Sequence, residues 1–217
     1  MDNKVVIITG TSRGIGKAIA NEFLNNEFEV IGLDRLESSI SNSNYKHYQL
    51  DLFKDELPEL KKCDILINNA GTQNENDIDN NLKATIKVTE KYAFQDNIKS
   101  VLFIASSSAS SGAEFPEYSA SKGGVLAYMK NVAMRIAKYQ ATSNSISPGG
   151  VITDLNDHIL QDKKLYEAVL NESLLKRWST ADEIAKWAYF VTVINKSMTA
   201  QDILIDNGEA NNFNFIW

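Results

Sequence analysis

The chain has 217 residues, 43% hydrophobic and 9% aromatic, a size that suits one domain with a sizeable core. Its net charge of −6 at pH 7 argues against a nucleic-acid partner, because binding to phosphate backbones usually needs a basic face. No apolar run reaches the roughly 18 residues of a membrane helix, and the N-terminus lacks an apolar signal region. We therefore expect one soluble cytoplasmic domain, residues 1–217, that binds neither nucleic acid nor membrane.

Cysteine and histidine are too scarce for an internal disulfide or for ordinary metal-ligand spacing. Cys63 is the single cysteine, and the two histidines, His47 and His158, are isolated from each other. We expect no metal site.

Short apolar runs of strand length alternate along the chain with longer segments of helical period. The expected elements, in chain order, are a strand at 4–9, a helix at 14–26, strands at 28–34 and 45–51, a short acidic helix from near Asp55, a strand at 64–68, a helix at 78–94, a strand at 100–106, a helix at 116–138, a strand ending in 143–150, a helix at 181–193 capped by Ser179 or Thr180, and a strand at 202–208. This alternation predicts an α/β fold with a doubly wound parallel β-sheet of the Rossmann type, flanked by helices on both faces.

In such a sheet the ligand lies beyond the carboxyl ends of the strands, and candidate residues follow the strands here. The segment "TGTSRGIG" (9–16) joins the first strand to the first helix, and its glycines Gly10, Gly14 and Gly16 allow a tight turn close to a pyrophosphate. Asp34, eighteen residues after Gly16, can accept hydrogen bonds from an adenosine ribose. A purely structural loop and a turn-forming aspartate are the alternatives.

The pentapeptide "YSASK" (118–122) places Tyr118 and Lys122 on one face of the longest expected helix. A tyrosine ordinarily loses its proton near pH ~10, and a fixed positive charge about 4 Å away is worth roughly one to three pKa units. A phenol so placed can exchange protons near neutral pH. The alternative is a chance pair on an exposed helix face.

The glycine spacing G-x-x-x-G-x-G, taken with Y-x-x-x-K, resembles the short-chain dehydrogenase/reductase family in its compact single-domain form. The resemblance runs nearly end to end, through "DL" (51–52), "NNAG" (68–71), "NNLKAT" (80–85), "IASSS" (104–108) and "SPGGVIT" (147–153). It implies an NAD(P)-dependent oxidoreductase that transfers a hydride between nicotinamide and an alcohol or carbonyl substrate. A non-catalytic NAD(P)-binding sensor on the same fold is the alternative.

The resemblance assigns four catalytic residues. Tyr118 would be the acid/base, and Lys122 would lower its pKa and bind the nicotinamide ribose. Ser106 would hold the substrate oxygen, with Ser107 and Ser108 one and two residues beyond it. Asn81 would anchor a water that links Lys122 to solvent, with Asn80 as the other register. This intact set favours the enzyme over the sensor.

The resemblance also implies a cofactor-binding set. Its members are Gly10, Ser12, Arg13, Gly14, Ile15, Gly16, Asp34, Arg35, Asp51, Leu52, Asn69, Ala70, Gly71, Tyr118, Lys122, Pro148, Gly149, Val151 and Thr153. The Asp34 carboxylate would repel the 2′-phosphate of NADP, which favours NAD. Arg13 and Arg35 stand where NADP-using relatives carry phosphate-binding cations, so NADP stays open.

Residues 154–178 are expected to form a mobile substrate lid whose apolar members cover a partly apolar pocket, although ordinary helix packing would give the same pattern. These apolar members are Leu155, Ile159, Leu160, Leu165, Tyr166, Val169, Leu170 and Leu174. A sugar or steroid-like secondary alcohol, a small ketone and a 3-oxoacyl thioester all remain candidate substrates.

Relatives associate through the helices that correspond to 77–96 and 116–138, so we expect a homodimer or homotetramer. The C-terminal aromatic residues Phe213, Phe215 and Trp217 are expected to pack against another subunit or to line its pocket. Only nine residues separate Gly71 from Asn81, fewer than in most relatives. One side of the substrate site is therefore expected to be open or covered by a partner subunit.

Overall fold

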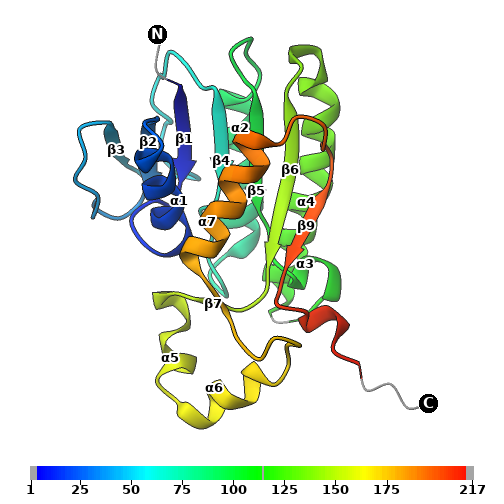
Figure 1. The fold of residues 1–217 in the computed structure, drawn as a ribbon. Coiled ribbons are helices and arrows are strands. Elements are labelled where there is room, and N and C mark those ends of the chain that lie inside the picture. Colours follow the sequence, from blue (N-terminus) through cyan, green and yellow to red (C-terminus); the bar gives the residue numbers. More distant parts are fainter. Residues whose placement is uncertain (1–3, 114, 214–217) are drawn as a thin grey trace.

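A seven-stranded sheet forms the centre of the computed structural model, which describes residues 4–113 and 115–213. The strand order is β3-β2-β1-β4-β5-β6-β9, and every neighbouring pair is parallel. The bounds are β1 Val5–Thr9, β2 Glu29–Asp34, β3 Tyr45–Gln49, β4 Ile65–Asn68, β5 Ser100–Ile104, β6 Thr142–Pro148 and β9 Asp202–Ile205. Helices lie on both sides of this sheet (Figure 1). The predicted doubly wound α/β fold is confirmed.

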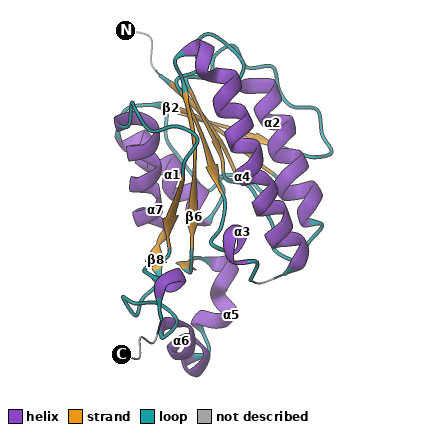
Figure 2. Cartoon of the chain, turned by 90° about the vertical axis from the view of Figure 1, so that its right-hand side faces the viewer, coloured by secondary structure: helices purple, strands orange, loops and turns teal. Residues whose placement is uncertain are grey.

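Two pairs of helices cover the two faces of the sheet. Figure 2 shows α1 (Gly14–Asn25) and α7 (Ala181–Tyr189) on one side, and α2 (Ala84–Tyr92) and α4 (Pro116–Ile136) on the other. The shorter helical elements are π-helical turns at Ile78–Lys83 and Phe190–Ile194, 3₁₀ turns at Ala137–Tyr139, Asp154–Asn156 and Glu209–Asn211, and the helices α3 Ser108–Ser111, α5 Asp157–Leu160 and α6 Lys163–Leu170. Across the described ranges, no helix is both long and apolar enough to cross a bilayer.

The alternation of side chains along β1 explains why both faces need a helical layer. Ile8 packs in one core cluster with Phe23 of α1, whereas Ile7 packs in the other with Tyr92 of α2 and Met129 of α4. All five side chains are fully buried. A strand buried on both faces reads as a continuous apolar run, as "VVIIT" does here.

The expected helix near Asp55 is wrong: residues 51–64 are all described, and they form no helix. Side chains take over the hydrogen bonds that a helix would make within itself. The Asp51 carboxylate accepts from the Phe53 backbone N–H, and the Lys87 ammonium of α2 donates to the Phe53 and Asp55 carbonyls. These contacts hold the segment against α2 without a helix.

Two helix boundaries were left imprecise by the sequence. The helix expected at 78–94 opens with a π-helical turn, a feature found frequently at functional sites. Of the two candidate caps for α7, Thr180 is the one used. Its hydroxyl accepts from the Glu183 N–H (3.2 Å), and the Glu183 carboxylate accepts from the Thr180 N–H (2.8 Å).

The segment expected to form a lid leaves the sheet through a narrow neck. Two short parallel strands, β7 (Val151–Ile152) and β8 (Ser179–Thr180), pair side by side and carry α5 and α6 between them. Figure 1 shows α5 and α6 beyond the end of the sheet toward which β6 and β9 point. No residue of these two helices, both wholly described, is buried. Residues 154–178, called the lid segment below, thus form a small layer set over the C-terminal edge of the sheet.

The three C-terminal aromatic residues can be placed only in part. Phe213 is described and is 72% exposed, whereas Phe215 and Trp217 lie outside the described residues. Their packing against another subunit stays a prediction.

Candidate active site

A cavity of about 640 Å³ lies between the carboxyl ends of the strands and the lid. Its lining extends from Asp34, at the end of β2, to Tyr118 on α4, with Leu155 and Trp178 contributed by the lid segment. A cavity at this edge is where doubly wound sheets bind ligands, and its size is typical of such sites.

Most of the predicted site residues share this cavity. The lining includes Gly10, Arg13, Gly14, Ile15, Asp34, Arg35, Asp51, Leu52, Asn69, Ala70, Gly71, Ser106, Tyr118, Lys122, Pro148, Gly149, Val151 and Thr153. Ser12, Gly16 and Asn81 stand outside the described lining, and each contacts or lies close to residues that form it.

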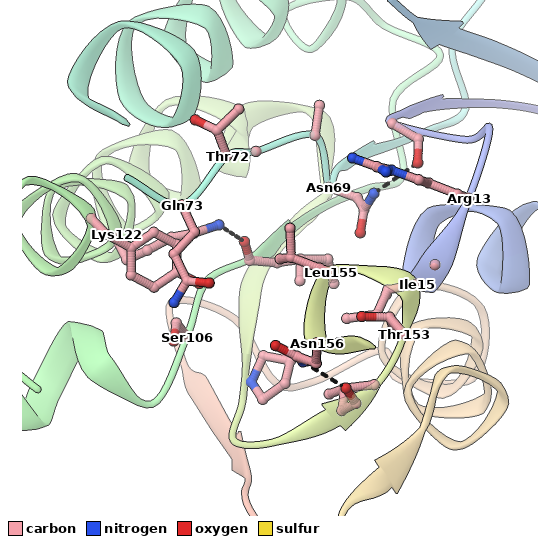
Figure 3. Close-up of a pocket in the computed structure, with 18 of the residues that line it drawn as sticks. Arg13, Ile15, Asn69, Thr72, Gln73, Ser106, Lys122, Thr153, Leu155 and Asn156 are labelled. Carbon is pink, nitrogen blue, oxygen red and sulfur yellow. Dashed lines mark hydrogen bonds between the residues drawn. The ribbon is translucent and has the colours of Figure 1, made fainter. Parts of the chain in front are cut away.

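The loop after β1 has the close backbone packing that its glycines predicted. Gly10 has a φ of +74°, and a Cβ there would lie 2.8 Å from the Asn69 amide nitrogen. A Cβ on Gly16 would lie only 1.9 Å from the Gly10 carbonyl oxygen. Asn69, whose side chain lies close to this loop in Figure 3, donates to the Thr9 and Gly10 carbonyls at 3.0 and 3.1 Å. The loop is therefore a backbone cradle at the N-terminus of α1, which suits a dinucleotide pyrophosphate.

Asp34 is buried and firmly oriented. One carboxylate oxygen accepts from the Ser12 N–H (2.8 Å) and the other from the Leu36 N–H (2.9 Å). Arg35 and Arg13, by contrast, are exposed, and Arg35 meets Glu75 at 3.4 Å through two solvated side chains. An exposed pair of this kind holds its members only weakly. The fixed charge at this end of the cavity is therefore negative.

A hydrogen-bonded chain that the motifs did not indicate supports the same end of the cavity. The Tyr45 hydroxyl lies 2.8 Å from the Thr11 hydroxyl and 3.0 Å from Nδ1 of His47, and Nε2 of His47 lies 2.9 Å from the Leu36 carbonyl. Because a carbonyl only accepts, Nε2 of His47 carries a proton and donates it to the Leu36 carbonyl. Gly32 leaves room for the Tyr45 hydroxyl, and burial raises the pKa of the Tyr45 phenol. The chain fixes the glycine-rich loop to the segment after Asp34.

Tyr118 and Lys122 meet as their spacing predicted. Lys122 is 5% exposed, and its ammonium lies 5.7 Å from the centroid of the Tyr118 ring. The same ammonium donates to the Ile104 carbonyl at 3.0 Å, which ties it to the end of β5. A helix of 21 residues therefore delivers both side chains to one wall of the cavity.

The hydrogen bonds of the serine run after β5 show which serine can donate into the cavity. Ser106 and Ser107 line the cavity, whereas Ser108 lies outside the described lining. The Ser108 hydroxyl donates to the Ser106 hydroxyl at 2.9 Å, so the Ser106 proton is left to donate elsewhere. Ser106 is the member that is both buried and oriented toward the cavity.

Asn81 lies in the π-helical turn, behind the cavity wall. Its carboxamide accepts from the Thr72 N–H (2.7 Å) and donates to the Thr72 carbonyl (2.9 Å) and to the Ser121 hydroxyl (3.1 Å). A Cβ on Gly71 would lie 3.0 Å from the Asn81 oxygen and 3.4 Å from the Lys122 ammonium, so both groups border Gly71. Asn80, the other register, instead donates to the Glu75 carbonyl.

The sequence missed several residues at the end of the cavity nearest residues 154–178. Among them are Thr72, Gln73, Phe115, Asn156, His158, Glu172, Trp178 and Glu209. Of the apolar lid residues that the sequence singled out, Leu155, Ile159 and Val169 belong to the lining, whereas Leu160, Leu165, Tyr166, Leu170 and Leu174 are outside its described part. Trp178 rests on Gly150, where a Cβ would lie 2.1 Å from the indole nitrogen. The glycine before β7 was the available signal for that contact.

No group of three or more His, Cys, Asp or Glu side chains in the described part of the chain could hold a metal ion. Cys63 is buried, and burial raises the pKa of its thiol.

Comparison with known proteins identifies the family of the chain. A family model described as "Enoyl-(Acyl carrier protein) reductase" matches residues 48–209, and one described as "short chain dehydrogenase" matches residues 4–54. The 3-oxoacyl-[acyl-carrier-protein] reductase FabG of Chlamydia pneumoniae is 30% identical, over 94% of this chain and 96% of that protein. The chain belongs to the short-chain dehydrogenase/reductase family. It is an oxidoreductase of that family.

Two solved structures with a similar fold extend the comparison. A 4-hydroxyisoleucine dehydrogenase complexed with NADH has a TM-score of 0.85 and 27% identity, over 97% of this chain and 100% of that one. ElxO with NADP bound has a TM-score of 0.87 and 24% identity, over the same shares of both chains. One structure of similar fold thus binds NADH and the other NADP.

Proposed function

We propose that the protein transfers a hydride between a nicotinamide cofactor and an alcohol or carbonyl substrate, with Tyr118 as the acid/base. The observation that carries this proposal is the convergence of three groups in one cavity. The Tyr118 phenol lies beside the buried Lys122 ammonium, and Ser106 lines the same cavity with its hydroxyl oriented by Ser108. These are the groups that a carbonyl oxygen needs around it when it gains a proton.

Each group has its own task in reduction. Ser106 donates its free proton to the substrate oxygen and so fixes that oxygen beside Tyr118. The Tyr118 hydroxyl gives its proton to the same oxygen, and the Lys122 ammonium stabilises the phenolate that is left. In oxidation the phenolate takes the proton back. Asn81 and Lys122 both border Gly71. The proton that Tyr118 gives up would be replaced from this side of the cavity.

The cavity residues fit a dinucleotide. The glycine cradle would hold the pyrophosphate, Asp34 the adenosine ribose, and Val151 and Thr153 the carboxamide end. When bound, the nicotinamide ring supplies or accepts the hydride. NAD is the favoured cofactor, because the buried Asp34 carboxylate would repel a 2′-phosphate while Arg13 and Arg35 are exposed. NADP remains the second candidate.

A non-catalytic dinucleotide sensor is the alternative function. It needs the cradle and Asp34, but it has no use for a serine whose proton is directed away from its neighbour or for an ammonium buried beside a phenol. The Ser108–Ser106 hydrogen bond and the buried Lys122 therefore favour the enzyme.

The test is an absorbance screen at 340 nm of NAD and NADP against alcohols and ketones, run on the wild type and on Tyr118→Phe. We expect turnover by the wild type, and a loss of roughly 10²- to 10⁴-fold in Tyr118→Phe, the range for removal of an acid/base group. NADH affinity, measured by fluorescence titration, should stay within about twofold, because the phenyl ring is retained. Full turnover by the variant would contradict the assigned role, and NADH binding without any turnover in the wild type would favour the sensor.

We also propose that the protein forms a homodimer or homotetramer in the cytoplasm. The helices α2 and α4 present the surface through which relatives are expected to associate, and Met134 of α4 is 71% exposed. Light scattering after gel filtration should give a mass of two or four chains of 24.2 kDa. A mass of one chain at micromolar concentration would contradict this proposal.

A further inference from the structure

The connection from β2 to β3, residues 35–44, contains no helix. A crossover between parallel strands usually includes a helix, and the packing of that helix on the sheet fixes the path of the chain after the first strand. In this protein the first two residues of the connection, Arg35 and Leu36, line the cavity directly after Asp34. The cavity wall around Asp34 therefore depends on contacts other than the packing of a crossover helix.

Two side chains of β3 supply such contacts. The Tyr45 hydroxyl lies 2.8 Å from the Thr11 hydroxyl of the glycine-rich loop and 3.0 Å from Nδ1 of His47. Nε2 of His47 donates to the Leu36 carbonyl at 2.9 Å. The pair thus connects the loop after β1 with the segment after β2.

Ser12 closes these contacts into a ring. Its hydroxyl donates to the same Leu36 carbonyl at 3.2 Å, and Ser12 follows Thr11 directly in the chain. The Ser12 N–H donates to one oxygen of the Asp34 carboxylate at 2.8 Å, and the Leu36 N–H donates to the other at 2.9 Å. Two members of the ring therefore hold the carboxylate that is proposed to bind the adenosine ribose.

The neighbouring strand makes room for the contact between Tyr45 and Thr11. A Cβ on Gly32 would lie 2.1 Å from the Tyr45 hydroxyl oxygen and 2.4 Å from the Thr11 hydroxyl oxygen, so a larger residue there would displace the pair. Thr11 is fully buried. A buried hydroxyl that loses its partner keeps its desolvation cost without compensation, so removal of the Tyr45 hydroxyl should disturb the glycine-rich loop.

We propose that Tyr45 and His47 are positioning residues that set the affinity of the cavity for the adenosine and pyrophosphate half of the dinucleotide. Both stand outside the described lining of the cavity, so they act through Asp34 and the glycine-rich loop. The ring holds the ribose-binding carboxylate and the pyrophosphate-binding loop in one arrangement, which removes the cost of ordering them when the cofactor binds. This inference rests on the proposed oxidoreductase function of the same cavity.

The test measures by calorimetry the Kd of NADH and of ADP-ribose, which contains the adenosine and the pyrophosphate but no nicotinamide. Tyr45→Phe removes only the hydroxyl, and His47→Phe keeps a ring and removes both nitrogens. Tyr48→Phe is the matched control. It also removes a hydroxyl from β3, but its ring packs in the core cluster of α2 and α4, whereas Tyr45 packs in the cluster of α1.

Tyr45→Phe should bind ADP-ribose roughly three- to tenfold more weakly than the wild type, the effect of one lost hydrogen bond. NADH should lose the same factor, because the ring supports the half of the cofactor that the two ligands share. Tyr48→Phe should change neither Kd. An unchanged Kd for ADP-ribose in Tyr45→Phe would overturn the proposal, and so would a loss of affinity confined to NADH.

A double variant tests whether Tyr45 and His47 act through one ring. Tyr45→Phe combined with His47→Phe should bind ADP-ribose no more than about twofold more weakly than the weaker-binding single variant, because each substitution opens the same ring. If the two losses of affinity multiply, the residues make independent contacts and the ring is not the positioning unit.

A merely structural role would give a different result. It would lower the melting temperature of Tyr45→Phe and leave both Kd values unchanged. The kcat of Tyr45→Phe at saturating NADH should stay within about twofold of the wild-type value, because Tyr118 and Lys122 are untouched. If the wild type binds both ligands but turns over no substrate, the positioning role is still tested and the oxidoreductase function is wrong. If it binds neither ligand, both proposals are wrong.

Discussion

The cofactor end and the lid end of the cavity are built in opposite ways. At the cofactor end, Gly10 and Gly16 are held by backbone contacts, and both carboxylate oxygens of Asp34 accept backbone hydrogens. At the lid end, α5 and α6 contain no buried residue and are joined to the body by two strands of two residues each. Local stability follows buried contacts. One end is therefore a rigid receptor, whereas the other is free to differ in shape and in side chains.

The rigid end should be the more sensitive to small changes. In Gly16→Ala, the added Cβ would lie 1.9 Å from the Gly10 carbonyl oxygen, so the loop has to move. We expect NADH binding at least about tenfold weaker, or a marked fall in melting temperature, because backbone cannot yield as a flexible side chain does. Fluorescence titration and thermal unfolding measure both effects.

Gly123→Ala is the matched control on α4. A Cβ there would meet only the Ala109 carbonyl oxygen, at an ordinary 3.6 Å. Glycine inside a helix costs roughly 0.5–1 kcal/mol relative to alanine, so this variant should unfold at the same or a slightly higher temperature. If the two variants have the same NADH affinity and melting temperature, the glycine-rich loop is not a rigid cradle.

Asp34→Asn should change cofactor preference. The substitution removes the negative charge and one of two acceptors, so NAD should bind roughly tenfold more weakly while NADP binds better. Glu37→Gln removes a charge from the exposed segment that follows β2, outside the described cavity lining, and should change the binding constant of neither dinucleotide. If Asp34→Asn keeps the wild-type ratio of NAD affinity to NADP affinity, then Arg13 or Arg35 sets the cofactor choice.

At the lid end, substitutions should alter the substrate and leave the cofactor alone. Leu155 lines the cavity, whereas Leu165, also an exposed leucine of the lid, is outside its described lining. We expect Leu155→Ala to raise KM for the substrate roughly three- to tenfold and to leave the Kd for NADH unchanged. Leu165→Ala should change neither constant. Equal effects of the two variants on KM would mean that the lid acts only as a structural layer.

The smallest effect is expected at the neck of the lid. The Arg177 guanidinium binds the Glu183 carboxylate at 2.8 Å through both nitrogens and, with the Thr180 N–H, lowers the pKa of Glu183 to about 2. A carboxyl whose pKa is lowered on folding contributes stability above its unfolded pKa of ~4.3 and loses it as the pH falls through the folded value.

Glu183→Gln should therefore unfold about 1–3 °C below the wild type at pH 7, and this difference should shrink between pH 4.5 and pH 2. Glu167→Gln, whose ion pair with Lys163 spans 3.9 Å on the surface, should show no difference. If the difference in melting temperature persists at pH 2, the side-chain packing of Glu183, and not its charge, stabilises the neck.

The two ends also differ in how far the sequence predicted them. Gly10, Gly16 and Asp34 follow strands at fixed spacing, because backbone contacts tolerate no other residue or position, so a pattern could find them. Tyr118 and Lys122 could be paired because a helix sets the distance between them. The missed residues either come from the lid or, like Gln73, depend on a turn whose path is set by the buried carboxylate of Asp77. No short spacing in the sequence encodes that path. Tyr45 and His47 were missed because their partners, Thr11 and Leu36, are also distant in the sequence.

The failed prediction of a helix near Asp55 has a related cause. Acidic residues and local propensity favoured a helix, but the Lys87 side chain of α2 binds the Phe53 and Asp55 carbonyls from outside. A contact between segments that are more than thirty residues apart outweighed a local preference.

The central claim is that the Lys122 ammonium makes Tyr118 able to exchange protons near neutral pH, and its most direct test is a pH profile. The rate of alcohol oxidation at saturating NAD is measured between pH 6 and pH 11 for the wild type and for Lys122→Met. Loss of the positive charge should move the rising limb of the profile up by about one pH unit or more, toward the ordinary tyrosine pKa of ~10. A limb at the same pH in both proteins would contradict the claim.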